Sequence, residues 1–214
     1  RWASTRLPAK PLLPLAGKPL VRHVWERCSK VRGVDAVIIA TDDMRIAEAA
    51  FEFGAEVAMT SPRHPSGTDR IAEVAKNLVG FDIVLNVQGD EPFIQPALVE
   101  KLATALREDK KLEMSTAACA LDPDGLANPN CVKVVTDLAG NALYFSRAPI
   151  PCDRDGDANP SRLRHLGIYG YRVDFLNRFI SLPPSPLEQA EGLEQLRALE
   201  DGARIKVHLT EHEA

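Results

Sequence analysis

The segment Asn86-Val87-Gln88-Gly89-Asp90-Glu91-Pro92 directly follows the short apolar run Ile83-Val84-Leu85. The run is typical of a buried strand, which the Gly, the two carboxylates and the Pro then end. Open α/β sheets bind their ligands just beyond the carboxyl ends of the strands. Asp90 and Glu91, with Gly89 leaving room for close approach, suit a hard cation such as Mg²⁺ that carries phosphate oxygens. Solvated carboxylates at a strand end fit the same spacing.

The composition of the 214-residue chain is that of an ordinary globular protein. Hydrophobic residues make up 45% and charged residues 26%, so we expect one domain with a sizeable core over residues 1–214. The net charge of −4 argues against a general nucleic-acid or membrane surface, and no apolar run reaches the length of a membrane span. Four scattered cysteines without a CxxC pair predict reduced thiols in a cytoplasmic protein.

Basic residues and prolines gather in residues 1–19, which predicts a loop. Arg1, Arg6 and Lys10 could wrap a phosphate chain there, or they could form a solvated basic terminus. No strand feeds this loop, and the chain ends just after the apolar run at 205–209. We therefore expect both ends to be truncated.

Between residues 20 and 106, helical and strand periodicities alternate, which predicts a parallel sheet covered on both faces. Asp42 and Asp43 are expected to cap a helix. Ser66 and Asp69 have the spacing of a capping box, and free amides at the helix start there would accept an anion. Arg70 lies close to the positive end of that helix, which is unfavourable unless an anion or a carboxylate is near.

After residue 112 the pattern changes to short strands, with a hairpin turn at 137–141. The segment 165–172 alternates as a strand does, which places His165 and Tyr169 on one face. Together with Arg147 and Arg154 they could line a pocket for an acidic, hydroxylated ligand, although the residues alone favour a mixed-charge surface.

The last predicted helix runs from a capping box at Ser185 to about Glu200. Glu194 would project from its largely apolar side. A carboxylate in that position is either misplaced by the prediction or there to bind something.

Seven segments of the chain together resemble one enzyme family, the 3-deoxy-manno-octulosonate (KDO) cytidylyltransferases or CMP-KDO synthetases. The first segment alone would indicate only a nucleotidyltransferase acting on sugars, whereas the fifth and sixth select KDO. The segments are RWASTRLPAKPL, PSGTDRIAEV, NVQGDEP, NPNCVKVV, ALYFSRAPIP, RHLGIYGYR and SPLEQAEGLEQLR.

The resemblance implies a Rossmann-like three-layer α/β/α sandwich with a mixed sheet, and a small β-rich extension at residues 113–165 that makes a homodimer. It implies the reaction CTP + KDO → CMP-KDO + diphosphate with Mg²⁺, which activates KDO for lipopolysaccharide biosynthesis. The partners are then two small molecules, with no nucleic acid and no membrane insertion.

The resemblance also assigns roles to residues that match the family motifs. Asp90 would hold Mg²⁺, and Asp90, Lys10 and Arg6 would be catalytic. The nucleotide would be bound by Arg1, Arg6, Lys10, Ser66, Gly67, Thr68, Arg70 and Gln88. The sugar would be bound by Gln88, Arg147, Arg154, His165, Tyr169, Glu194 and Gln195.

The chain departs from the family pattern at both ends. It lacks the family's first strand and the VDTPEDL-like segment whose first Asp is a second metal ligand. Two alternatives therefore stand beside KDO activation. One is a cytidylyltransferase for a related acidic sugar, amino-KDO or sialic acid, and the other is an inactive, truncated CTP-binding form.

Overall fold

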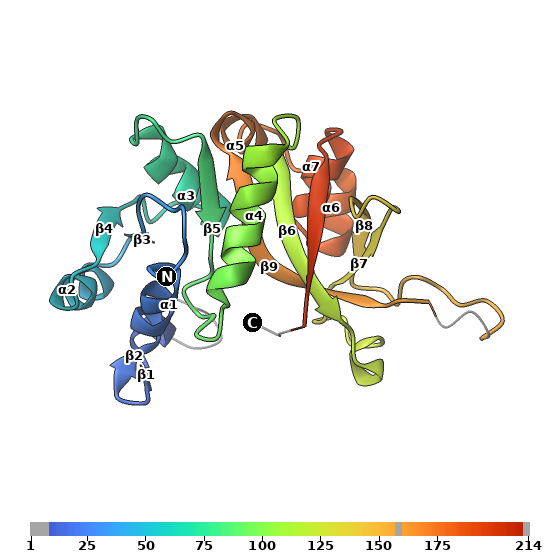
Figure 1. The fold of residues 1–214 in the computed structure, drawn as a ribbon, viewed down its shortest axis with the longest axis horizontal. Helices are drawn as coiled ribbons and strands as arrows, with labels where there is room; N and C mark the ends of the chain where they lie inside the picture. The colour runs from blue at the N-terminus through green and yellow to red at the C-terminus, as the bar shows by residue number, and fades with distance from the viewer. Residues whose placement is uncertain (1–8, 157–159, 212–214) are drawn as a thin grey trace.

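The computed structural model describes residues 9–156 and 160–211 of the chain (Figure 1). The α-helices are α1 (Leu20–Cys28), α2 (Met44–Glu52), α3 (Gly67–Lys76), α4 (Pro96–Glu108), α5 (Val173–Phe179), α6 (Pro186–Glu191) and α7 (Gln195–Glu200). The strands are β1 (Pro14–Leu15), β2 (Lys18–Pro19), β3 (Ile38–Thr41), β4 (Glu56–Met59), β5 (Ile83–Asn86), β6 (Met114–Ala120), β7 (Lys133–Thr136), β8 (Ala142–Ser146), β9 (Leu163–Arg172) and β10 (Ile205–Thr210). No helix in these ranges has the length and hydropathy needed to cross a bilayer.

The main sheet is six-stranded and mixed. Strands β10, β6, β9, β7 and β8 follow one another in hydrogen-bonded order, and β5 also pairs with β9. The prediction of a parallel sheet is right for β3 with β4 but wrong for β5, because the antiparallel strand β9 lies between β5 and β6. Gly170 makes this close pairing possible, since a Cβ there would lie 2.6 Å from Ser115 Oγ.

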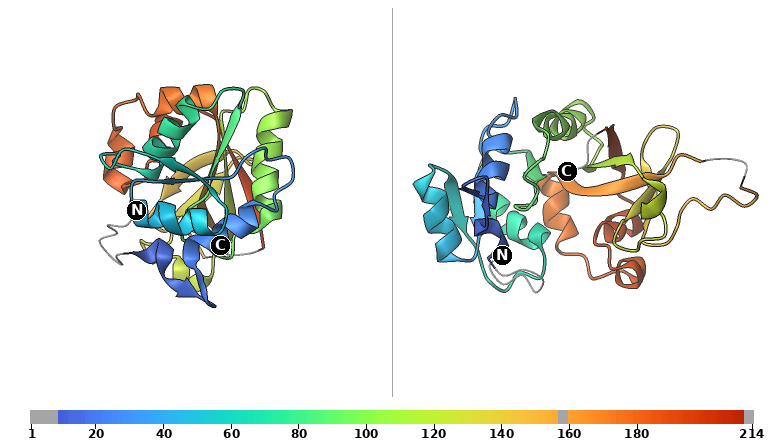
Figure 2. Two further views of the ribbon diagram at one scale, coloured as in Figure 1. Left: turned by 90° about the vertical axis from the view of Figure 1, so that its left-hand side faces the viewer. Right: turned by 90° about the horizontal axis from the view of Figure 1, so that it is seen from below.

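Helices cover both faces of this sheet, which gives the expected three layers (Figure 1, Figure 2). One core joins α1 and α4 to the sheet through residues such as Val24 and Leu102. The other core joins α3, α5 and α7 to the opposite face through residues such as Phe175 and Leu196. The α/β fold class predicted from the sequence is therefore confirmed.

Several local predictions are also confirmed. Asp43 caps α2 by accepting a hydrogen bond from Arg45 N at 3.0 Å. Ser66 caps α3, and Ser185 forms a complete capping box at the start of α6. Strands β7 and β8 form the expected hairpin. These features depend on residues close together in the chain, so the local sequence is enough to specify them.

The prediction of one helix from Ser185 to Glu200 is wrong. Gly192 adopts a left-handed conformation with φ of 61°, which ends α6, and α7 begins three residues later. Glu194 is consequently the N-cap residue of α7 and not a mid-helix residue. The break turns its carboxylate towards the start of α3, as described below.

Candidate active site

Two acidic residues lie just beyond β5, where the sequence predicts a ligand. Asp90 makes an ion pair with Lys10 in which both side chains are well exposed, at 42% and 38%. Glu91 is half-buried, and its buried Oε2 has no hydrogen-bond partner in the described part of the chain. Burial, and then the neighbouring Asp90, raise the pKa of the Glu91 carboxyl. The loop thus presents two hard oxygen donors at the sheet edge.

The two carboxylates suit Mg²⁺, which needs few protein ligands. They are too few for a metal that is coordinated by protein side chains alone. Residues 9–156 and 160–211 contain no group of three His, Cys, Asp or Glu side chains that could hold a metal. Mg²⁺, however, is usually bound by one or two carboxylates together with substrate phosphates. Asp90 and Glu91 supply a donor set of that kind.

The start of α3 faces α7. The Thr68 hydroxyl donates to Glu194 Oε2 at 2.7 Å. Ser66 Oγ lies 3.0 Å from Glu194 Oε1 and 2.6 Å from Asp69 Oδ2, and its single hydrogen serves one of these two carboxylates at a time. Ser66 Oγ also accepts from Asp69 N at 3.2 Å, as a capping residue does. The α3 start and the N-cap of α7 are therefore joined, although they are 126 positions apart in the sequence.

The side chain of Arg70 has other partners than those of Ser66 and Thr68. It is 5% exposed, and its guanidinium lies 3.1 Å from Asp42 Oδ2 and also contacts Thr60. A carboxylate therefore offsets the cation near the positive end of α3, which was one of the two explanations that the sequence left open. Asp42 pairs with Arg70, and only its neighbour Asp43 caps a helix.

A cavity of about 370 Å³ lies between β3, α1 and the loop after β5. Three of the predicted nucleotide-site residues line it, namely Gly67, Arg70 and Gln88. In the described residues no hydrogen-bonded ladder joins β3 to β5, which leaves this space between the two strands. Most of its lining consists of apolar side chains of α1, β3 and β5, such as Val24, Ile39 and Leu85.

His165 and Tyr169 lie side by side on β9, with ring centroids 5.4 Å apart. Burial lowers the pKa of His165 to about 3, so the ring is neutral. Burial, and then the Glu194 charge, raise the pKa of the Tyr169 hydroxyl far above its usual value. Gln195, also predicted for the sugar, is buried at the start of α7. The structure thus brings His165, Tyr169, Glu194 and Gln195 into one region, as predicted.

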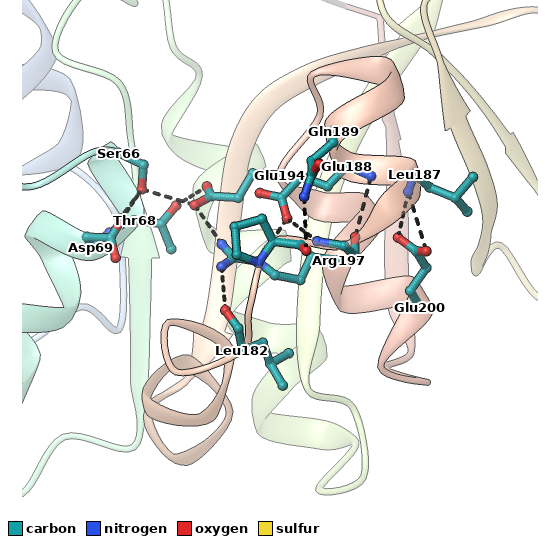
Figure 3. A network of polar contacts seen from close by, with 12 residues as sticks. Ser66, Thr68, Asp69, Leu182, Leu187, Glu188, Gln189, Glu194, Arg197 and Glu200 are labelled. Atoms are coloured by element: carbon teal, nitrogen blue, oxygen red, sulfur yellow. Dashed lines mark hydrogen bonds and ion pairs between the residues drawn. The ribbon is translucent and has the colours of Figure 1, made fainter.

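Arg197 organises this region, and sequence reasoning missed it. Its guanidinium lies 3.2 Å from Glu194 Oε1 and 3.3 Å from Glu188 Oε2, and it donates to Leu182 O at 3.0 Å (Figure 3). It also lies 4.5 Å from the centre of the Phe179 ring. In the sequence, the only sign of this buried arginine is the i, i+3 spacing of Glu194 and Arg197. That spacing is common for ion pairs on helix surfaces, so it did not indicate a buried group.

Arg147 is not free to bind a ligand in this conformation. Its guanidinium donates to three backbone carbonyls, those of Glu191, Pro129 and Gly192, at 2.7, 2.8 and 3.2 Å. Beside it, the Lys133 amine donates to the carbonyls of Asn128 and Cys131 and to that of Arg147. The two cations cross-link the segments around β7, β8 and α6.

Another predicted residue, Arg154, is not brought to the site. Arg154 has a side chain that is 93% exposed and pairs with Asp155 at 3.7 Å, in the segment 147–156 that leads away from the sheet (Figure 1). Arg1 and Arg6 lie outside the described residues.

Known proteins resemble this chain over nearly its whole length. The cytidylyltransferase family model matches residues 1–205. A 3-deoxy-manno-octulosonate cytidylyltransferase from Geobacter sulfurreducens is 49% identical over 100% of this chain and 90% of its own length. A protein of the same name from Leptothrix cholodnii is 53% identical, over 98% of this chain and 81% of its own length.

A solved structure shares the fold closely. It is a CMP:2-keto-3-deoxy-manno-octonic acid synthetase complexed with CTP, with a TM-score of 0.95 and 45% identity over 99% of this chain and 87% of that one. A Leptospira borgpetersenii cytidylyltransferase, at 17% identity and a TM-score of 0.62, shares only the fold.

The chain belongs to the cytidylyltransferase family, a family of nucleotidyltransferases. The resemblance to its 3-deoxy-manno-octulosonate branch, which the seven sequence segments predict, is confirmed.

Proposed function

We propose that this chain is the enzyme that activates KDO, by the reaction CTP + KDO → CMP-KDO + diphosphate. The observation that carries the proposal is the contact of Glu194 with Ser66 and Thr68. This contact joins the residues predicted for the nucleotide to those predicted for the sugar. A two-substrate transfer needs such a junction, because both substrates must be held within reach of each other.

The chemical step is the attack of the KDO anomeric hydroxyl on the α-phosphorus of CTP. The new P–O bond forms as the bond to diphosphate breaks, and the hydroxyl loses its proton. Transfer of this kind requires positioning and charge neutralisation more than covalent catalysis. Lys10, beside Asp90, would offset charge on the departing diphosphate, and Arg1 and Arg6 are predicted to help.

Asp90, with Glu91 beside it, is the residue that would hold Mg²⁺. When bound, the ion supplies positive charge to the phosphate oxygens. Lys10 occupies Asp90 in this conformation, so metal binding requires the amine to move from the carboxylate. Gln88, which lies in the same loop two residues before Asp90, would contact the nucleotide.

On the sugar side, Tyr169, His165, Glu194 and Gln195 would contact the hydroxyls of KDO. Both rings remain uncharged at neutral pH, since burial lowers the pKa of His165 and raises that of Tyr169. Arg147 and Arg154 were predicted for the KDO carboxylate. In this conformation the first is held by carbonyls and the second is exposed, so either residue would have to move to bind it.

Release of diphosphate from CTP with Mg²⁺ tests this proposal. We expect release with KDO, and much less with sialic acid, with amino-KDO or without sugar. Release that does not depend on sugar, or that is faster with sialic acid, would contradict it.

We also propose that the enzyme acts as a homodimer in the cytoplasm. The free thiols of Cys28, Cys131 and Cys152 suit a reducing compartment. Light scattering should give twice the chain mass, and cell fractionation should place the protein with cytoplasmic markers. A monomer, or recovery in another fraction, would refute the respective part.

A further inference from the structure

A buried threonine lies directly against His165. Thr116 of β6 is 0% exposed, and β9 departs from regular register opposite it, between Thr116 and Ala117. Its Oγ1 lies 2.7 Å from Ile168 O, 3.3 Å from Leu166 O and 2.9 Å from His165 Nε2. The irregular register thus brings two carbonyls and an imidazole nitrogen to one hydroxyl.

These three contacts determine where the protons are. A threonine hydroxyl has one hydrogen to donate, and a carbonyl oxygen can only accept. The hydrogen of Thr116 must therefore point to a carbonyl, the nearer being Ile168 O, because otherwise two oxygens would face each other at 2.7 Å without a proton. The remaining contact then requires His165 Nε2 to donate to Thr116 Oγ1 at 2.9 Å.

The protonation state of the other ring nitrogen, Nδ1, follows from the charge of the ring. Because burial keeps His165 neutral, only one nitrogen carries a proton, and Nδ1 is an acceptor. In residues 9–156 and 160–211, Thr116 is the only hydrogen-bond partner of the ring. Phe145 faces the ring edge-on at 4.9 Å and Tyr169 lies on another side at 5.4 Å, so the ring is held in place.

We propose that Thr116 is a positioning residue that fixes His165 as the Nε2–H tautomer, so that Nδ1 accepts a hydrogen bond from a sugar hydroxyl. This inference rests on the proposed function. A bare nitrogen lone pair attracts a hydroxyl and repels a carboxylate. His165 would therefore recognise one hydroxyl of the acidic sugar, and the carboxylate of the sugar must be bound by a cation elsewhere.

The experiment compares three variants of the full chain. Thr116→Val removes the hydroxyl at nearly constant volume, and Thr116→Ser retains it. Ser115→Ala is the matched control, because Ser115 is also fully buried on β6 but donates to Leu102 O at 3.1 Å, away from His165. The readouts are the ¹⁵N resonances of the His165 ring, assigned with His165→Gln, and the KM values for KDO and for CTP.

In the wild-type protein we expect a protonated Nε2 and an unprotonated Nδ1, and the Nδ1 resonance should shift when KDO is added. Thr116→Val should mix the tautomers and raise the KM for KDO about tenfold, the usual scale of one hydrogen bond. The KM for CTP should change less than about twofold. Thr116→Ser and Ser115→Ala should keep the wild-type tautomer and KM for KDO.

Three results would overturn the proposal: a wild-type ring protonated on Nδ1, a KM for KDO unaffected by Thr116→Val, or equal rises of both KM values. If Thr116→Val does not fold, the wild-type spectrum with and without KDO decides alone, since an Nδ1 resonance unmoved by bound KDO refutes the contact. A wild-type protein with the expected tautomer but neither turnover nor binding of KDO would instead refute the proposed function.

Discussion

The nucleotide side and the sugar side of this site are built in different ways. On the nucleotide side, Lys10, at the start of a short 3₁₀ helix, and Asp90, in the loop after β5, form an exposed ion pair. On the sugar side, Glu194 is held by Ser66, Thr68 and the buried Arg197. Exposed ion pairs add little to stability, whereas breaking a buried one is costly.

This difference matches what each side must do. Phosphates and a metal ion bring their own charge, so exposed side chains that can rearrange are sufficient to receive them. The hydroxyls of a sugar differ from one another only in the direction in which they point. The groups that bind them must therefore already be in place. The buried network around Glu194 therefore fixes geometry, and the exposed Lys10–Asp90 pair supplies charge.

The largest expected effect belongs to the exposed side and concerns activity alone. Asp90→Asn should lower kcat about 10²–10³-fold, because it removes the carboxylate that would hold Mg²⁺. The free energy of unfolding should change by less than about 0.5 kcal/mol, as for other surface substitutions. Diphosphate release and denaturant unfolding measure the two quantities. Full activity in this variant would remove Asp90 from the metal site.

The next effect belongs to the buried side and concerns stability. Arg197→Met should lower the free energy of unfolding by about 3 kcal/mol, because Glu188 and Glu194 would lose their buried cation.

The control is Arg178→Met, since Arg178 also contacts two carboxylates and an aromatic ring but its side chain is 50% exposed. We expect a loss below about 1 kcal/mol there. Equal losses in chemical denaturation would show that burial does not distinguish the two sites.

His165 makes the buried side sensitive to acid. The pKa of His165 is about 3 in the folded chain, below the ordinary unfolded value of about 6.5. Between these values the unfolded chain binds a proton that the folded chain does not. The free energy of unfolding should therefore fall by about 1.4 kcal/mol for each pH unit as the pH decreases through this window. His165→Gln should lack this component, and identical slopes of unfolding free energy against pH would refute the assignment.

The smallest expected effect is that of Lys10→Met on stability. The exposed pair with Asp90 should contribute less than about 1 kcal/mol to the free energy of unfolding. Thermal unfolding at low and high salt checks this, and a loss as large as that of Arg197→Met would erase the distinction between the two sides.

Local features were predictable from sequence because the residues that form them are close together. The caps at Asp43, Ser66 and Ser185 and the hairpin of β7 and β8 are examples. The pairing of β9 with β5 depends on residues more than eighty positions apart and was not predicted. The break at Gly192 was missed because the apolar spacing continues through it.

The site was predictable in its residue types but not in its contacts. The sequence pattern alone singled out Ser66, His165, Tyr169 and Glu194, and the family resemblance assigned their ligands and added Thr68. Their mutual arrangement depends on residues that the sequence does not distinguish from surface or core positions. Arg197 has the spacing of an ordinary helix-surface ion pair, and Thr116 that of an ordinary strand residue.

The enclosed amine of Lys133 can report how often the structure around it opens. This amine is enclosed by backbone carbonyls and the residue is 0% exposed, whereas the side chain of Lys10 is 38% exposed. An amine-reactive reagent should therefore acylate Lys10 rapidly and reach Lys133 only when the junction of β7, β8 and α6 opens. The ratio of the two labelling rates, read by mass spectrometry of peptides, measures how often that junction opens in the folded protein.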